Sequence, residues 1–525
     1  MMTSKIQPTL VSNAIKKILI LVLSLLVTFG ALEVWVRMSA PIENYIQENV
    51  FSPSRSTEQE KYWRDLLVTQ NISADTYNIY YFGESTMNGE PYGDTIPVMV
   101  DQVLQKPING KEVRWVNMAE RAIDTAESAR RIRWVFDHQE LTRPSLIVLY
   151  AGHNEYLKFH DCCGFSVSHQ YGKTLQRMIN SSKLVAKLSQ AFRLYKLEIE
   201  DRSYFDQPVV PLNEFQAVNK HYEEAVRQIV NDVQKNKVPF IISTVASNYA
   251  DFEPNRSSYC ERNDRQDEFK QLMDRGLKLE KEAAFPDAKE TYFTALNICD
   301  QFSETHYRLA KVYQAMNQPN DAWQEFELAV DLDRMPIRAQ TSQNAYIRSL
   351  QNQEFVHVVD AVNALRMQDN DGLIGDNMMT DGHHPNLLGY NIIAQLIARK
   401  ISMITNTNLP RPTIPEDFHN AFIPDLPSKK MVFMDSAEWF IRLSTWRFES
   451  SARLTKASEY LEKYAALGEP SAKQYVFSMI IAIIRHDIPL ARQQLEKARQ
   501  LNAKETDVLL KDYWISQFLE RLTEI

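Results

Sequence analysis

The sequence from Tyr77 to Gly89 reads Y-N-I-Y-Y-F-G-E-S-T-M-N-G. Its apolar, aromatic run predicts a buried β-strand, and the break at Gly83 predicts a tight turn that presents the hydroxyl of Ser85. Serine is common in turns because its hydroxyl hydrogen-bonds the nearby backbone. A chemical role for Ser85 therefore depends on the groups that the rest of the chain brings beside it.

Downstream of this stretch, short apolar runs alternate with helical patterns. The predicted strands are 77–82, 113–116, 146–150, 240–245 and 356–359. The predicted helices are 95–104, 124–138, 215–235 and 387–404. Alternation at this spacing implies crossover connections and a parallel, three-layer α/β sheet. Ligands of such sheets bind at the carboxyl ends of the strands. Ser85, Asn117 and Gly152 all follow predicted strand ends.

A serine hydroxyl is a poor nucleophile near neutral pH. It needs a base within hydrogen-bond reach and a group that holds this base in one tautomer. The stretch D-G-H-H-P-N, which begins at Asp381, supplies both. We predict that His384 is the base and Asp381 its orienting carboxylate, because this spacing lets the carboxylate reach one imidazole nitrogen while the other faces Ser85. The adjacent His383 is the alternative base.

The negative charge that develops on a carbonyl oxygen under attack needs hydrogen-bond donors. The candidates are the backbone amide of Ser85, the amide near Ala122 after V-N-M-A-E-R-A, and the side chain of Asn154 in G-H-N-E. Gly152 and Asn117 are candidate supporting residues at the same sheet edge.

The four blocks G-E-S, V-N-M-A-E-R-A, G-H-N-E and D-G-H-H-P-N resemble, in this order, those of the SGNH (GDSL-type) hydrolase superfamily. The resemblance covers about 77–404. It implies a flavodoxin-like sheet and a serine esterase or acyltransferase that needs no cofactor. It also implies Ser85 as nucleophile, Asn154 and backbone amides as the oxyanion hole, and Asp381 with His384 completing the triad.

Two residues depart from the superfamily pattern. Glu84 replaces the Asp of the Gly-Asp-Ser block, and Ala122 stands where an oxyanion-hole Gly is usual. Glu84 transfers no proton in this scheme, and Ala122 still has an N–H to donate. The Ala122 methyl group narrows the expected site, which favours small acyl groups.

The same residues could instead belong to an ordinary α/β-hydrolase or to a metal site. An ordinary α/β-hydrolase is disfavoured because G-E-S-T-M lacks the second glycine of G-x-S-x-G. A metal site built from Asp381, His383, His384 and His153 requires ligands that meet at one point with an open coordination position. Nothing in the sequence demands such a site, and we predict no metal.

A repeat interrupts the strand–helix alternation. At a shift of 34 residues, Gly276 aligns with Ala310 and Tyr292 with Phe326. This period resembles a tetratricopeptide pair at 268–335, and membrane-anchored, repeat-containing bacterial SGNH proteins combine the same parts. A weaker repeat predicts a second helical array at 435–525. Such repeats either bind a protein partner on a concave face or buttress the sheet, and both remain open.

The N-terminus predicts a membrane anchor. After Lys16 and Lys17, the apolar run 18–36 has the length of one bilayer-crossing helix. The excess of Lys before it places the N-terminus in the cytoplasm and the rest outside. A cleavable signal peptide is the rival interpretation, but the residues before Pro41 make a poor cleavage site.

Composition limits the partners and the compartment. The net charge of −8 and the absence of a basic stripe argue against nucleic-acid binding. Four cysteines are compatible with an oxidising compartment and allow three pairings. We favour Cys260 with Cys299, whereas Cys162 and Cys163 are equally well explained as free thiols. The basic insertion 160–211 is a solvated helix face, a lid or a membrane-facing piece.

The predicted organisation has seven parts. They are a cytoplasmic stub and anchor at 1–40, a juxtamembrane segment at 41–76, hydrolase segments at 77–267 and 336–404, the repeat insert at 268–335, a proline-rich linker at 405–434 and helical repeats at 435–525.

The predicted function is that of a serine esterase outside the inner membrane that removes small O-acyl groups, preferably O-acetyl from a surface glycan, by family analogy. An O-acyltransferase with the same triad and a non-catalytic repeat scaffold remain as alternatives.

Overall fold

The structure is a computed structural model that describes residues 56–104, 107–161, 164–165, 209–210, 212–260, 264–409, 425–447 and 450–523. The predicted anchor at 1–40, most of the insertion at 160–211, and Cys162 with Cys163 lie outside the described residues. Among the described helices, none has the length and hydropathy needed to cross a bilayer.

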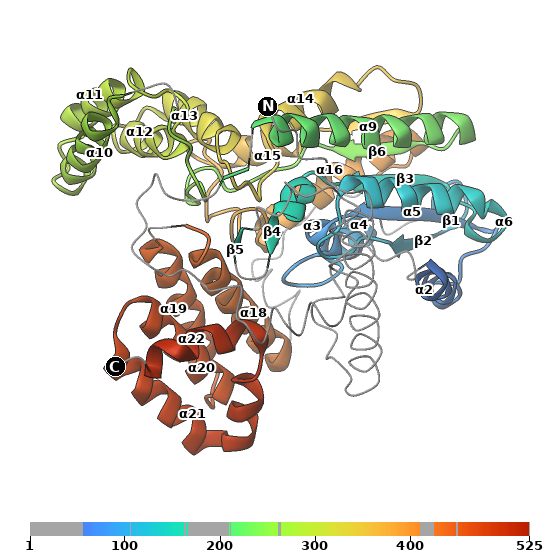
Figure 1. Ribbon diagram of the computed structural model, residues 1–525. Coiled ribbons are helices and arrows are strands. Elements are labelled where there is room, and N and C mark those ends of the chain that lie inside the picture. The colour runs from blue at the N-terminus through green and yellow to red at the C-terminus, as the bar shows by residue number, and fades with distance from the viewer. Residues whose placement is uncertain are drawn as a thin grey trace, which may run out of the picture. The chain divides into compact units, whose positions relative to one another are not determined.

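The α/β part of the described chain contains a parallel five-stranded sheet (Figure 1). Its strands are β1 (Thr76–Gly83), β2 (Glu112–Asn117), β3 (Leu146–Tyr150), β6 (Phe240–Ser243) and β7 (Val356–Val359). They lie in the order β2-β1-β3-β6-β7, and every pair is parallel. The five predicted strands are confirmed, and the order is that of a flavodoxin-like sheet.

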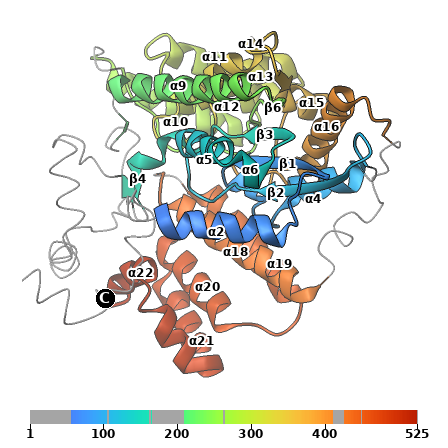
Figure 2. The same cartoon turned by 90° about the vertical axis from the view of Figure 1, so that its right-hand side faces the viewer.

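Helices cover both faces of this sheet (Figures 1 and 2). On one face α4 (Thr95–Leu104) packs against α16 (Leu387–Thr405), beside α15 (Ala361–Gln368). On the other, α5 (Thr125–Asp137) packs against α9 (Leu212–Asn236), beside α14 (Thr341–Ser349). Short elements at the strand ends are α3 (Ser85–Asn88), α6 (Gln139–Thr142), the 3-10 helix η2 (Asn154–Phe159) and the ribbon of β4 (His160–Asp161) with β5 (Gly164–Phe165). The central strands are buried because both faces are covered.

The α/β domain begins earlier than the sequence predicts. Helix α2 (Ser56–Thr69) lies inside the segment predicted to be juxtamembrane. Trp63 and Leu67, one helical turn apart, are buried in the main core, and the Trp63 ring lies 5.0 Å from that of Trp134 on α5. Two apolar residues at this spacing form one face of a helix, so the segment joins the domain through packing.

The repeat insert consists of two helical hairpins. Its helices are α10 (Gln266–Lys281), α11 (Phe285–Leu296), α12 (Ser303–Ala315) and α13 (Pro319–Asp331). A methyl group at Gly276 would meet the Tyr292 ring at 2.4 Å, so the small residue lets α10 and α11 approach. The disulfide joins Cys260 and Cys299, the pairing favoured from the sequence.

A second helical region, here called the C-terminal block, spans 425–523. It contains α18 (Leu426–Ser444), α19 (Ser451–Ala466), α20 (Ala472–Ile484), α21 (Ile488–Leu509) and α22 (Tyr513–Thr523). Helix α18 starts inside the predicted linker 405–434, which corrects that boundary. The Asp425 side chain accepts from the Ser428 amide at 2.8 Å, and Pro427 lies in the first turn, where proline is tolerated.

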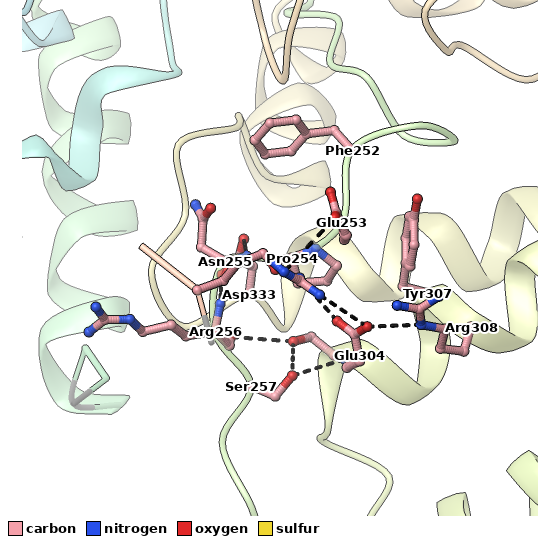
Figure 3. Close-up of polar contacts among 12 residues, drawn as sticks. Phe252, Glu253, Pro254, Asn255, Arg256, Ser257, Glu304, Tyr307, Arg308 and Asp333 are labelled. Carbon is pink, nitrogen blue, oxygen red and sulfur yellow. Dashed lines mark hydrogen bonds and ion pairs between the residues drawn. The ribbon is translucent and has the colours of Figure 1, made fainter. Parts of the chain in front are cut away.

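Buried ion pairs connect the insert, the C-terminal block and the loop after β6. We call Glu253, Glu304, Arg308, Arg447 and Arg453 the arginine network. Arg447 contacts Glu304 at 3.3 Å, and the side chains of both are at most 2% exposed. Arg308 donates to Glu304 at 2.9 Å (Figure 3), and Arg453 donates to the Glu253 carbonyl at 2.9 Å. Each buried charge therefore has an opposite charge or a carbonyl beside it.

Candidate active site

Ser85 lies where β1 ends and α3 begins. Gly83 has φ +150°, and a methyl group there would meet the Tyr150 carbonyl oxygen of β3 at 2.1 Å. Only glycine therefore fits the point at which the chain leaves the sheet. Ser85 is the first residue of α3, so its N–H has no partner within the helix. The turn thus presents a hydroxyl and an amide together.

Ser85, His384 and Asp381 meet at this turn, although 299 residues separate the serine from the histidine. His384 Nε2 lies 2.8 Å from Ser85 Oγ, and His384 Nδ1 lies 2.7 Å from Asp381 Oδ2. If Nδ1 carries the proton and donates to Asp381, Nε2 is the acceptor that faces the hydroxyl. This is the geometry in which an imidazole removes a proton from serine.

Asp381 is fixed by its own loop. Its Oδ1 accepts from the backbone amides of His383 and His384, each at 2.9 Å. Burial alone raises the pKa of Asp381, but the His384 and His383 rings and these amides outweigh burial and hold the pKa well below its usual range. The residue is therefore a carboxylate at neutral pH and can stabilise a protonated His384.

Glu84 has a structural role that the sequence did not reveal. Its carboxylate is buried and accepts from the backbone amides of Gly152, His153 and Asn154 at 2.9, 3.0 and 3.2 Å. Burial, followed by the Glu155 carboxylate, raises the pKa of Glu84, whereas the three amides act in the opposite direction. The side chain clamps the turn after β3 onto the serine turn.

The clamp places Asn154 beside the reaction centre. Asn154 Nδ2 donates one hydrogen to the Ile123 carbonyl at 3.0 Å, which leaves the second hydrogen for another acceptor. Gly152 adopts φ +147° in the same turn. Glu155 in turn accepts from the amide and the hydroxyl of Thr125, which ties the turn to α5.

Ala122 lies in the turn that follows β2 and adopts φ +58°, in the left-handed region. This conformation costs an L-residue about 1–2 kcal/mol, which explains in physical terms why a glycine suits the position. Asn117, the last residue of β2, makes no hydrogen bond to the triad. Its Nδ2 donates to the Met87 carbonyl at 3.2 Å and to Asp94 Oδ1 at 2.7 Å. Asn117 therefore braces the segment behind α3.

Two further histidine rings extend the site. The His383 ring centroid lies 4.0 Å from that of His384 and 5.0 Å from that of His153. His153 Nδ1 accepts from the Ala339 amide at 3.0 Å. Burial, followed by the neighbouring His383 and His384, holds the pKa of His153 well below its usual value. His153 is therefore a neutral packing group beside the triad.

Asp381, His383 and His384 have ligand atoms close enough together to be considered as a metal site. However, Asp381 already accepts two amides and one imidazole, and His384 uses both ring nitrogens, one of them towards Ser85. Metal binding would require these hydrogen bonds to break. The donor set fits a triad better than a metal centre.

The C-terminal block packs directly on the loop that carries Asp381 and His384. The Trp439 ring of α18 lies 6.2 Å from the His383 ring and 6.4 Å from the His384 ring. On α19, Lys456 pairs with Asp376 at 2.7 Å, and the Tyr460 hydroxyl contacts the Thr380 carbonyl at 3.5 Å. No sequence pattern marked these residues, because a repeat period does not tell which helix faces a distant loop.

No protein-family model and no curated protein matches this chain. Similar solved structures include a GDSL-like lipase from Bacteroides thetaiotaomicron VPI-5482, with TM-score 0.30 and 11% identity over 66% of this chain and 97% of that chain. A lipolytic G-D-S-L family member from Veillonella parvula DSM 2008 has TM-score 0.28 and 12% identity, over 62% of this chain and 97% of that chain. A tetratricopeptide repeat protein from Parabacteroides merdae ATCC 43184 has TM-score 0.16 and 11% identity, over 59% of this chain and 96% of that chain.

These neighbours are of the two kinds that the sequence resembles, GDSL-type hydrolases and tetratricopeptide proteins.

Proposed function

We propose that this protein is a serine esterase with Ser85 as nucleophile, His384 as general base and Asp381 as the group that orients His384. The observation that carries the proposal is the continuous hydrogen-bonded line from Asp381 through His384 to Ser85, with distances of 2.7 and 2.8 Å. A buried carboxylate, an imidazole and a hydroxyl in line supply what an activated serine requires.

The reaction proceeds in two halves. Ser85 Oγ attacks the ester carbonyl carbon while His384 Nε2 takes the hydroxyl proton, and the oxyanion is held by the Ser85 and Ala122 amides and by Asn154 Nδ2. The carbon–oxygen bond to the alcohol then breaks, and His384 returns the proton to the departing alcohol. Water, activated by His384, attacks the acyl-Ser85 ester and releases the carboxylic acid. No step requires a cofactor.

For the substrate we propose a small O-acyl group, such as O-acetyl, on a glycan outside the inner membrane. The apolar run 18–36 and the Lys residues before it support an anchored protein with its site on that side. The Cys260–Cys299 disulfide supports the same placement, because disulfides persist in oxidising compartments. The glycan itself rests on analogy with the superfamily.

The experiment is active-site labelling of the purified full-length protein with a fluorophosphonate probe, together with turnover of p-nitrophenyl acetate. We expect wild type to label and turn over, and Ser85→Ala and His384→Ala to lose turnover by at least ~10³-fold. Ser458→Ala is the matched control, because its hydroxyl only donates to the Leu454 carbonyl within α19. A folded wild type that neither labels nor turns over would exclude the esterase. Acyl transfer is then distinguished from hydrolysis by adding an acceptor sugar and measuring the ester formed.

A further inference from the structure

One face of α18 carries two side chains that the triad does not use. Asp435 and Trp439 are four residues apart and therefore lie on the same side of the helix. Trp439 is partly exposed and meets the His383 and His384 rings edge to face, with interplanar angles of 83° and 64°. The indole thus forms a wall beside the general base and still has surface open to solvent.

Asp435 borders the same region. It is half-buried and, among the described residues, makes no hydrogen bond or ion pair. Burial raises the pKa of Asp435. The charges of Lys473 and Arg121 lower this pKa, and those of Glu438 and Glu90 raise it. Arg121 directly precedes Ala122 and pairs with Glu90. Asp435 therefore offers, one helical turn from Trp439, a partly exposed carboxylate without a side-chain partner among the described residues.

The chemistry of the triad fixes which part of an ester comes close to Trp439. His384 Nε2 gives its proton to the departing alcohol, so the alcohol oxygen must lie next to the imidazole. The carbonyl oxygen points instead to Asn154 and the amides of Ser85 and Ala122. Because Trp439 packs on the imidazole, it borders the alcohol side of the site.

We propose that Asp435 and Trp439 form a subsite for the alcohol part of the ester, and that this alcohol is a sugar ring. The inference rests on the proposed esterase function and adds the residues that recognise the substrate. A sugar ring presents C–H bonds that pack on an indole and hydroxyl groups that donate to a carboxylate. A lipid alcohol would bury the Asp435 charge without a partner, which is unfavourable.

The subsite is held in place before substrate arrives. Lys456 and Tyr460 of α19 fasten the block to the loop at Asp376 and Thr380. The Tyr460 ring stacks on Phe440 of α18 at 5.9 Å, next to Trp439 in the sequence. The wall and the general base therefore belong to one packed unit.

The test uses three acetate esters that differ only in the alcohol: ethyl acetate, cyclohexyl acetate and 6-O-acetylglucose. Trp439→Leu should lower kcat/KM for both ring alcohols relative to ethyl acetate by roughly threefold to tenfold, and Trp439→Phe should restore most of it. Asp435→Ala should lower kcat/KM for 6-O-acetylglucose alone, by about tenfold or more, because cyclohexyl acetate has no hydroxyl to donate.

Two controls separate recognition from folding. The ratio of p-nitrophenyl acetate to p-nitrophenyl butyrate should not change, because it reports the acyl side. Trp514→Leu removes another buried indole of the same block, one whose ring contacts Phe477, Phe518 and the Arg442 guanidinium but neither His383 nor His384, and should leave the alcohol ratios unchanged.

Equal losses for all three acetates in Trp439→Leu would overturn the proposal and make Trp439 a support for His384. An unchanged sugar preference in Asp435→Ala would also overturn it. Both outcomes leave fluorophosphonate labelling of Ser85 intact, whereas failure of the esterase proposal itself appears as a wild type that does not label.

Discussion

Two buried clusters of charged and polar side chains lie in this protein, and only one of them has the components of a catalyst. The triad joins a carboxylate, an imidazole and a hydroxyl at the carboxyl ends of parallel strands. The arginine network joins carboxylates to guanidinium groups where the insert meets the C-terminal block. Apart from Arg308, whose side chain is 21% exposed, the residues of both clusters are almost fully buried, so burial alone does not distinguish a reactive site from a structural cluster.

The difference lies in which groups can exchange protons. A guanidinium is charged near neutral pH and has no lone pair to accept a proton, and the lowered pKa values of Glu253 and Glu304 keep these carboxylates charged there, so no group of the network exchanges protons near neutral pH. The neutral imidazole of His384 has one donor and one acceptor nitrogen, and its Nε2 faces the Ser85 hydroxyl. We therefore expect changes in the triad to abolish reaction and changes in the network to weaken the fold.

The largest expected effect comes from Asp381→Asn. The carboxamide oxygen of this variant can still accept from the two backbone amides, but its NH₂ group would face His384 Nδ1. The imidazole proton would then be placed on Nε2, which could no longer accept from Ser85. Turnover of p-nitrophenyl acetate should fall by on the order of 10³- to 10⁴-fold. The thermal unfolding midpoint should also fall, because the lowered pKa of Asp381 means that its charge stabilises the fold, so turnover is compared at a temperature at which the variant is folded.

Asp371→Asn is the matched control for that prediction, since Asp371 is exposed and lies in the same stretch between α15 and α16, where its Oδ1 accepts from the Leu373 amide. Its turnover should stay within about twofold of wild type, because the Asn oxygen can still accept that hydrogen bond and the lost charge is screened by solvent. Equal activity of the two variants would contradict the role given to Asp381.

The next effect in size concerns stability. Arg447→Met leaves Glu304 and Glu253 buried without their main counter-charge, which costs about 3–5 kcal/mol. The thermal midpoint and the denaturant midpoint should both fall, while molecules that remain folded still label with fluorophosphonate. Lys278→Met breaks an exposed pair with Glu282 in the insert and should change stability by less than about 0.5 kcal/mol. A similar change of the free energy of unfolding in both variants would show that the arginine network does not stabilise the fold more than a surface ion pair.

The sequence predicted the parts of this protein that follow local rules. The five strands and the alternation of helices come from apolar runs and periodicity, which act over short distances. The flavodoxin-like order of the strands was implied only by the resemblance, and the strand ends predicted that Ser85 and Asn154 share one edge of the sheet. Asp381 and His384 do not follow a strand end and were placed beside Ser85 from their spacing and the resemblance. Their catalytic roles remain proposals that the experiments above test.

Other features depend on contacts that no local pattern encodes. Glu84 looked like a mere departure from the Gly-Asp-Ser block, yet it clamps three amides from a turn about 70 residues away. Trp439 comes from a helix that starts inside the predicted linker, since Pro427 lies in the first turn of this helix, where proline is tolerated. Arg447 and Glu304 pair across 143 residues, a partnership fixed only by how the helical regions pack.

The smallest expected effect is the response of the network to acid. Burial alone raises the pKa of Glu304, but Arg447 and Arg308 outweigh it, and the folded pKa is lowered. The same balance, with Arg447 and Arg453, lowers the pKa of Glu253. Below the unfolded pKa of about 4.3, the unfolded chain binds more protons at these sites than the folded one. Their stabilisation is therefore present above that pH and is lost as the pH falls.

Glu304→Gln isolates this contribution. The variant should be less stable than wild type at pH 7, because Arg447 loses a charged partner. Its free energy of unfolding, measured by denaturant titration, should fall less steeply between pH 5 and pH 3, with a slope that differs from wild type by at most about 1.4 kcal/mol per pH unit. The two curves should converge in acid. The pKa of Asp381 is also lowered, so Asp381 contributes to acid sensitivity in the same direction, and the measurement is repeated in the Asp381→Asn background. Curves that stay parallel there would assign the acid sensitivity to groups other than Glu304 and leave the network as a brace that pH does not control.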